Sequence, residues 1–358
     1  MIRPRLTLVP LDGDAAPALP PAEAPATDLH GDHWARGARA DHAVNVVTGG
    51  PPDWVRRLLR QELDGAIGAY PDEADATAAI AHRHGRAPAD VVLLNGAAHG
   101  FALIAETLAP RAPVIIHPQF TEPDRALRAA GCRPRHVLLE APFALDPDAV
   151  AADADLVVVG NPTNPTGVLH PRAAVHALGA PGRTVVVDEA FMDFVPGETE
   201  SLAGRSDLPG LVVVRSLTKM WGLAGLRVGY VLASAEVIER LRTAQPLWAV
   251  STPALAAIEA CTSKSVSAET LLAASAVAHE RDLLARALSS LGFHVSPGAT
   301  ANFLLVQGPD GLHEALRELG VAVRRCDTFP GLGPDWVRIA VRDAASNAQL
   351  LAAATATR

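Results

Sequence analysis

The chain has 358 residues, of which 49% are hydrophobic, and its net charge is −8. This length exceeds what one hydrophobic core usually supports, so we expect one large domain and a smaller one. The acidic balance, without a basic stripe, argues against nucleic acid as the main partner.

Cysteine use and the apolar runs limit the cellular setting. The three cysteines lie far apart and form no CxxC pair, so we expect neither a disulfide framework nor a zinc site. The first residues contain no continuous apolar stretch of the secretory type, and no later run approaches a membrane span. These features predict a cytoplasmic protein that binds no membrane and no metal. The cysteines are Cys132, Cys261 and Cys326.

The N-terminal half predicts an arm followed by alternating strands and helices. Residues 1–28 are rich in Pro, Ala and acidic residues, and we extend the predicted arm to residue 40. Stretches of helical period, such as residues 122–131, separate short β-branched runs that are typical of strands buried on both faces. This alternation predicts an α/β fold with a mostly parallel central sheet. The runs are 91–94, 114–116, 156–160, 184–188 and 211–215.

The C-terminal part follows a different pattern. From about residue 233 the sequence becomes more helical, and strands are expected at 301–308 and 335–342 around a helix at 311–320. We therefore predict a large domain over residues 41–240 and a small α+β domain over residues 241–358.

Polar or glycine-rich turns follow all five apolar runs. They read NGAAHG, HPQF, NPTNPTG, DEAF and SLTK. Any one of them could be an ordinary turn, since Gly, Pro, Asn and Asp are common turn residues. Ligands of open α/β sheets bind at the carboxyl ends of the strands, so five such turns together predict one shared site.

Lys219 lies in the stretch SLTKMWGLAGLRVGY, between hydroxyl residues and a glycine-rich apolar run. In a dry site, burial disfavours the charged form of lysine and leaves a neutral amine that can form a Schiff base with an aldehyde. A solvated loop lysine is the commoner case. This stretch, however, resembles the active-site segment of the class I/II aminotransferases, which have the type I fold of pyridoxal-phosphate enzymes.

The resemblance covers roughly residues 40–345 and implies that pyridoxal 5'-phosphate is the cofactor. By analogy, Lys219 is the catalytic residue that carries it. Asn164 matches the asparagine that hydrogen-bonds the cofactor's phenolic oxygen. Asp188 matches the aspartate that keeps the pyridine nitrogen protonated, and Phe120 lies where the family stacks an aromatic ring.

The same resemblance implies a set of ligands for the cofactor phosphate. The backbone N–H groups of Ala97 and Ala98 would form an anion cup at a helix start. Ser216 and Arg227 match the family's hydroxyl and guanidinium ligands. Tyr70 resembles the tyrosine that reaches the phosphate of the neighbouring subunit, which implies a homodimer with shared active sites.

Two positions depart from the family pattern. His99 lies in the phosphate turn, where an acidic residue is common, and the resemblance gives it no role. Phe191 replaces a tyrosine that bonds the cofactor in many relatives, a change expected to tune the site and not to abolish activity.

Substrate binding is implied for three further residues. Arg338 matches the arginine that binds the substrate carboxylate. Arg324 matches an arginine that some subfamilies use for a distal phosphate, although its neighbour Arg325 could be the ligand instead, because alternating strand geometry lets only one face the site. His30, in HGDH, aligns with a phosphate-contacting segment, but the aspartate there would repel a phosphate.

Two subfamilies share this layout. The stretches RRCDTFPGLGPDWVRIAVR and VVTGGPPDWVRRLL favour a threonine-phosphate decarboxylase of cobalamin biosynthesis, acting on a small phosphorylated amino acid. The alternative is a histidinol-phosphate aminotransferase, which transaminates with 2-oxoglutarate and glutamate. The same residues serve both reactions, so the sequence leaves the choice between decarboxylation and transamination open.

Three other classes of protein fit less well. A Rossmann dehydrogenase would need a GxGxxG turn after an early strand, and none is present. A pyridoxal-phosphate-dependent transcription regulator would need a DNA-binding domain, for which about 40 residues are too few. A metal hydrolase would need a carboxylate partner at helical spacing from HRHG at residues 82–85, and there is none.

Overall fold

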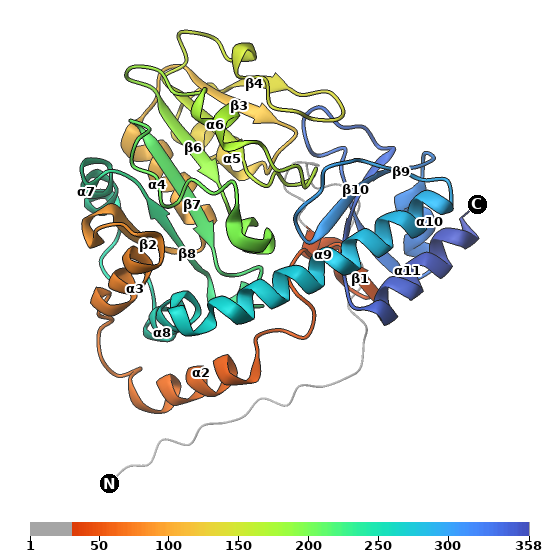
Figure 1. Cartoon of the computed structure of the whole chain (residues 1–358), viewed down its shortest axis with the longest axis horizontal. Coiled ribbons are helices and arrows are strands. Elements are labelled where there is room, and N and C mark those ends of the chain that lie inside the picture. Colours follow the sequence, from red (N-terminus) through yellow and green to blue (C-terminus); the bar gives the residue numbers. More distant parts are fainter. Residues whose placement is uncertain (1–30, 358) are drawn as a thin grey trace, which may run out of the picture.

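The computed structural model describes residues 31–357, so most of the predicted N-terminal arm lies outside the described residues. Within them, two β-sheets and their covering helices form two layered units (Figure 1). None of the helices in this range is both long enough and apolar enough to cross a membrane.

The larger sheet has seven strands in the order β2-β8-β7-β6-β5-β3-β4. Strands β7, β6, β5, β3 and β4 run parallel to one another, whereas β8 pairs antiparallel with both β2 and β7. All five apolar runs of the sequence form strands, which confirms the predicted α/β class. The strands are β2 (Val91–Asn95), β3 (Pro113–His117), β4 (Arg135–Leu138), β5 (Leu156–Gly160), β6 (Thr184–Asp188), β7 (Leu211–Ser216) and β8 (Val228–Leu232).

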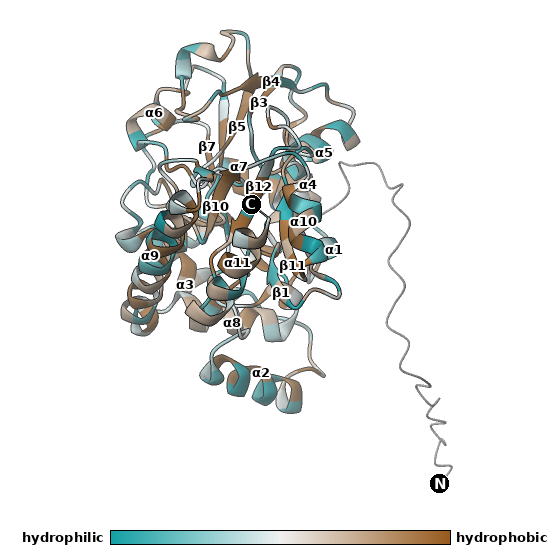
Figure 2. Ribbon diagram, turned by 90° about the vertical axis from the view of Figure 1, so that its right-hand side faces the viewer, coloured by the Kyte–Doolittle hydropathy of each residue, from teal (hydrophilic) through white to brown (hydrophobic). Residues whose placement is uncertain are grey.

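The central strands are apolar at consecutive positions because helices cover both faces of the sheet. Val157 and Val159 of β5 face one hydrophobic cluster, and Val158 between them faces another. Side chains alternate between the faces of a strand, so each face needs its own apolar set. Figure 2 shows the resulting hydrophobic strands inside a more polar rim of helices.

The helices differ widely in length. The longest, α9, crosses the front of the molecule from the large sheet to the small one (Figure 1). The helices are α1 (Gly31–Ala35), α2 (Asp53–Gly65), α3 (Ala74–His84), α4 (Ala97–Leu108), α5 (Glu122–Ala129), α6 (Arg172–His176), α7 (Ala235–Ala244), α8 (Thr252–Thr262), α9 (Ser267–Ser290), α10 (Leu312–Glu318) and α11 (Ala344–Ala356).

The smaller sheet has five strands in the order β1-β11-β12-β10-β9. The two strands and the helix expected in the C-terminal part are present as β10, β12 and α10. Strand β1 pairs with β11, so residues 40–42 join the smaller sheet although the sequence placed residue 41 at the start of the large domain. The strands are β1 (Ala40–His42), β9 (His294–Val295), β10 (Phe303–Gln307), β11 (Val321–Arg325) and β12 (Trp336–Ala340).

Candidate active site

A cavity of about 580 Å³ lies at the carboxyl ends of the parallel strands, between the two sheets. Residues from both sheets line it, as expected for the shared site of an α/β fold. The structure therefore brings together residues that the sequence placed in one site. They are Ala97, Ala98, Phe120, Asn164, Asp188, Ser216, Lys219, Arg227, Arg324 and Arg338.

Two predicted site residues are not among the lining residues. Tyr70 is 77% exposed and stacks on Trp248, with ring centroids 4.2 Å apart. This position agrees with a role in a neighbouring subunit but does not test it. His30 lies outside the described residues, although the next residue, Gly31, lines the cavity.

Asp188 is the last residue of β6, and Lys219 follows the adjacent parallel strand β7. Lys219 Nζ donates to Asn45 Oδ1 at 3.2 Å and lies 5.9 Å from the centre of the Phe191 ring. The Asp188 carboxylate accepts from the Ala190 N–H at 3.0 Å. Burial raises the pKa of Asp188 to about 6, although that N–H and the charge of Lys219 both favour the ionised form. A cation beside Asp188 would compensate this burial.

Because its pKa is raised, ionised Asp188 lowers the stability of the cofactor-free folded chain. Its carboxyl is still protonated between pH 4 and 6 in the folded chain but ionised in the unfolded chain, so stability falls as the pH rises through this range. The gap from the ordinary value corresponds to about 3 kcal/mol. At pH 8 we therefore expect the free energy of unfolding of cofactor-free Asp188→Asn to be higher than that of the wild type by about this amount. Urea unfolding at pH 8 and pH 4 tests this, and a gap of equal size at both pH values would contradict it.

The start of α4 is built to receive an anion. The first turn contains no acidic residue, and the helix begins after Gly96, which has a φ of 80°. A Cβ on Gly96 would lie 2.4 Å from Arg227 Nη2, and one on Gly229 would lie 3.0 Å from Ala97 N. Both glycines thus let the helix start and the guanidinium come close together. The hydroxyls of Ser216 and Thr218, 2.7 Å apart, lie in the same cavity wall.

Gly96→Ala is expected to weaken cofactor binding by at least about 100-fold, because the added methyl group displaces Arg227 and strains the positive φ. Gly85→Ala is a matched control: its φ is also positive, at 62°, but nothing lies within 4 Å of the added carbon. Equilibrium titration of each cofactor-free variant with pyridoxal 5'-phosphate measures the effect. Equal affinities for the two variants would contradict a role for the start of α4 and Arg227 in binding the cofactor phosphate.

His99, which the resemblance left without a role, has a local structural one. Its Nδ1 accepts the backbone N–H of Asn95 at 3.3 Å, and partial burial lowers its pKa. A neutral imidazole therefore satisfies the N–H at the end of β2, in the turn that leads into α4.

Arg324 and Arg338 are direct register partners on the neighbouring strands β11 and β12. Both are therefore on one face of the small sheet, and both line the cavity. Arg325 is not among the lining residues and pairs with Asp327. Of the two arginines that the sequence left open, Arg324 is therefore the one that lines the cavity, and its contact with a substrate phosphate stays a prediction.

The two guanidinium groups place two like charges side by side at the cavity. Arg338 donates to Asn164 Oδ1 and to the Ala43 carbonyl, each at 2.6 Å, and its buried Nε has no hydrogen-bond partner within the described part of the chain. Burial and the neighbouring Arg324 lower the pKa of Arg338 to about 9. Like charges on opposed strand positions are destabilising, so a bound anion would relieve the pair.

Sequence reasoning missed several residues around the site. Asn45 holds Lys219 from more than 170 residues away and carries no local motif. Glu189 and Arg215 are immediate neighbours of Asp188 and Ser216, and they form a buried ion pair of 3.0 Å that ties the end of β6 to β7. Because the pair adjoins Asp188 and Ser216 in the chain, it positions these site residues through the backbone. Breaking the pair would leave an uncompensated buried charge.

The residues around the cavity fit pyridoxal 5'-phosphate. They provide an amine at Lys219, a buried carboxylate at Asp188, and a cradle of N–H, hydroxyl and guanidinium donors that a Cβ at Gly96 would fill. An aldehyde, a basic ring nitrogen and a phosphate match these three groups in turn.

Comparison with known proteins agrees with this site. The family model for aminotransferase class I and II matches residues 42–356. Histidinol-phosphate aminotransferase of Mycobacterium tuberculosis (strain ATCC 25618 / H37Rv) is 47% identical over 93% of this chain and 92% of its own length. Threonine-phosphate decarboxylase of Salmonella typhimurium is 34% identical over 87% of this chain and 89% of its own.

A solved structure of histidinol-phosphate aminotransferase from Sinorhizobium meliloti, in complex with pyridoxal-5'-phosphate, has a TM-score of 0.78. It is 24% identical and covers 87% of this chain and 89% of its own, which shows a common fold. Fold and site thus define a pyridoxal-phosphate-dependent enzyme of fold type I. The chain belongs to the class I and II aminotransferase family, as the active-site segment around Lys219 predicted.

Proposed function

We propose that this enzyme transfers the amino group of histidinol phosphate, or of a closely similar phosphorylated amine, to 2-oxoglutarate. The 47% identity to the mycobacterial histidinol-phosphate aminotransferase, which extends over 93% of the chain, carries this proposal. The sequence favoured threonine-phosphate decarboxylase on short segments, and the relatives support the alternative better. Full-length identity is the stronger guide because both subfamilies share the same catalytic residues.

The chain's own residues divide the work of the reaction. Bound pyridoxal 5'-phosphate supplies an aldehyde that an amine can capture and a ring that accepts an electron pair from a bond broken at Cα. The neutral amine of Lys219 would take a proton from the substrate Cα, become an ammonium, and later give that proton back. Asp188 would hold its negative charge near the ring nitrogen of the bound cofactor, and the Glu189–Arg215 pair would fix the position of this carboxylate.

Arg324 and Arg338 bind and orient the two substrates in turn. In this proposal, Arg324 binds the phosphate of the amine substrate. Arg338 binds the α-carboxylate of 2-oxoglutarate or glutamate, with its unpartnered Nε available as a donor. Asn164 accepts from Arg338, so its amide NH₂ can donate to the cofactor.

A paired assay of the holoenzyme tests this function. Histidinol phosphate is supplied with and without 2-oxoglutarate, and O-phosphothreonine is supplied without any amino acceptor. We expect glutamate to form only in the presence of both histidinol phosphate and 2-oxoglutarate, and no CO₂ to be released. Release of CO₂ from O-phosphothreonine, without glutamate formation from histidinol phosphate, would overturn the proposal.

Threonine-phosphate decarboxylase is the second candidate. Two guanidinium groups on one cavity face suit a single substrate that bears both a carboxylate and a phosphate. The 34% identity to the Salmonella decarboxylase also favours it. In that reaction Lys219 would return a proton to Cα after CO₂ leaves. The paired assay separates the two candidates directly.

We further propose that the enzyme is a cytoplasmic homodimer. Tyr70 and Trp248 stack on one another at the surface, and Leu247 beside them is 79% exposed. Helix α2, which leads to Tyr70, lies at the lower end of the molecule (Figure 2). A second copy would bury this apolar surface, and exposed apolar patches of this kind mark interfaces.

Leu247→Glu is expected to shift the dimer toward monomer, because it places a charge inside the proposed interface. Sedimentation velocity at several protein concentrations measures the change. Leu138→Glu is the control, since Leu138 is 55% exposed on edge strand β4, at the opposite side of the large sheet from β2. Equal sedimentation of both variants and the wild type would place the interface elsewhere.

A further inference from the structure

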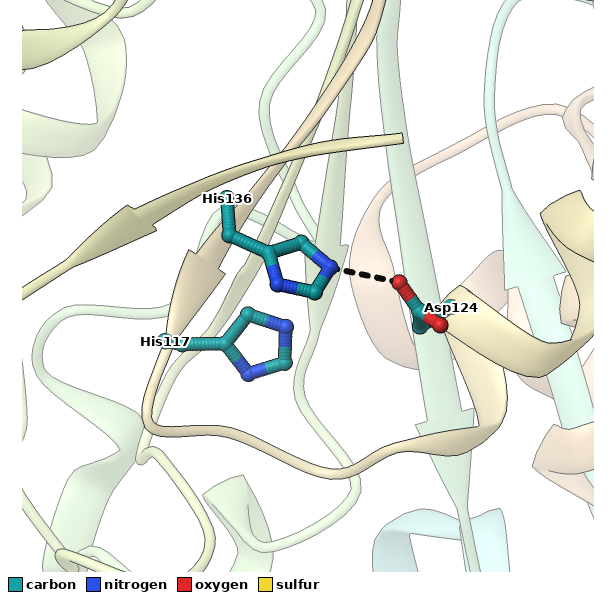
Figure 3. Close-up of side chains that lie close together, drawn as sticks. All are labelled: His117, Asp124 and His136. Atoms are coloured by element: carbon teal, nitrogen blue, oxygen red, sulfur yellow. Dashed lines mark hydrogen bonds and ion pairs between the residues drawn. The ribbon is translucent and has the colours of Figure 1, made fainter. Parts of the chain in front are cut away.

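Three potential metal ligands lie together at the β4 edge of the large sheet. His117 ends β3, Asp124 lies in α5, and His136 lies on β4 (Figure 3). One ligand atom from each lies within 4.8 Å of the other two. Strands β3 and β4 are parallel neighbours connected through α5, so the fold assembles this cluster from one β-α-β segment. None of the three residues lines the cavity that holds Lys219.

His117 supplies an independent sign that a ligand belongs here. Its side chain is completely buried, and its Nε2 has no hydrogen-bond partner within the described residues. A buried polar atom without a partner is costly and needs a physical reason. Figure 3 shows the His117 ring beside that of His136, with centroids 4.5 Å apart, and Asp124 beyond it.

We propose that His117, Asp124 and His136 bind a divalent transition-metal ion of the zinc class. Two imidazoles and one carboxylate are a ligand set that such ions prefer, and three protein ligands leave a fourth position for water. The side chains of Asp124 and His136 are 18% and 27% exposed, which gives the ion access from solvent. Tetrahedral zinc would hold the ligand atoms about 3.3 Å apart, so binding requires them to close in from their present separation of within 4.8 Å.

The contacts already present do not prevent binding. His136 Nε2 lies 2.6 Å from Asp124 Oδ1, and the same carboxylate pairs with Arg128, whose side chain is 55% exposed. Exposed ion pairs of this kind contribute little, so a metal ion can replace them. Coordination through His117 Nε2 places the ring proton on Nδ1 and gives up only the long 3.4 Å contact from the Gln119 N–H.

The site would tie β3, α5 and β4 together close to the cavity. Phe120, which lines the cavity, lies three residues after His117 and two residues before the start of α5. A metal ion here would fix both ends of the turn that carries Phe120. Its role is therefore structural, and it takes no part in the transamination chemistry.

Metal titration of the chelator-treated holoenzyme tests this site. Calorimetry with Zn²⁺ and visible absorption with Co²⁺ are expected to show one ion per chain in a low-symmetry, four-coordinate environment. Zn²⁺ should also raise the Tm. His136→Gln and His117→Gln are each expected to weaken binding by at least about tenfold, since even outer-shell changes cost this much. His136→Gln is the safer variant because its side chain is partly exposed.

Two control variants sharpen the result. Arg128→Gln removes the other partner of Asp124 without removing a ligand, so binding should be unchanged or tighter. His279→Gln replaces an exposed histidine on α9 and should leave binding unchanged. Absence of a bound ion in the wild type would overturn the proposal. So would equal affinity in the wild type and His136→Gln, because the ion would then lie elsewhere.

Discussion

Lys219→Ala is expected to lower kcat by about 10⁴-fold, because the same amine captures the cofactor and moves the proton at the substrate Cα. The variant should also lose the absorbance of the lysine-bound cofactor while still binding pyridoxal 5'-phosphate through the α4 cradle. Activity is measured as glutamate formed from histidinol phosphate and 2-oxoglutarate, and the cofactor is followed by its visible spectrum.

The sequence offers a clean control for this change. It contains only one other lysine, Lys264, which is exposed in the short helix Lys264–Val266. Lys264→Ala should retain wild-type kcat and spectrum. A Lys219→Ala enzyme within tenfold of wild-type kcat would remove Lys219 from the catalytic role.

Arg324→Ala should reduce kcat/KM for the phosphorylated substrate by about 10²- to 10³-fold, the usual cost of truncating one partner of a buried charge pair. The loss for the unphosphorylated amine, histidinol, should be small, because that molecule has no phosphate to bind. Steady-state kinetics with both amines at saturating 2-oxoglutarate separate a phosphate contact from a general disturbance of the cavity.

Arg325→Ala is the matched control for Arg324. The two arginines are adjacent on β11, but Arg325 pairs with Asp327 and Glu314 outside the cavity. Its replacement should change kcat/KM by no more than about twofold, as for most surface substitutions. Equal losses of both amines in Arg324→Ala would show that this residue supports the cavity without binding the phosphate.

Much of the large sheet was predictable because its strands are buried on both faces. Runs such as 156–160 and 184–188 each contain three consecutive valines, and no helix-like period competes with them. The polar residues that follow these strands gather at one edge for purely topological reasons, so the sequence could indicate the site as well. Asp188 and Lys219 are examples.

Other features depend on contacts that no local pattern encodes. Strand β8 inserts antiparallel between β2 and β7, which only the complete sheet order reveals. The side-chain direction of Arg324 follows from its register with Arg338. Asn45 reaches Lys219 from a distant segment. Each requires knowing which strands are neighbours, and the sequence did not show this.

The metal-ligand cluster was invisible for the same reason. His117, Asp124 and His136 are separated by 7 and 12 positions, which matches no metal-binding motif. In the sequence, only the histidines at 82–85 indicated a possible metal site, and no bound metal was expected. Of these, His84 is held by Tyr230 at 2.8 Å in the interior of the large domain.

Reduction of the holoenzyme with borohydride, followed by peptide mass spectrometry, tests the role of Lys219 most directly. Reduction makes the bond between the cofactor and its lysine permanent, and the chain offers two lysines to choose between. We predict one cofactor adduct per chain, on the peptide that contains Lys219. An adduct on Lys264, or no adduct in a protein that retains full activity, would contradict the assignment of this active site.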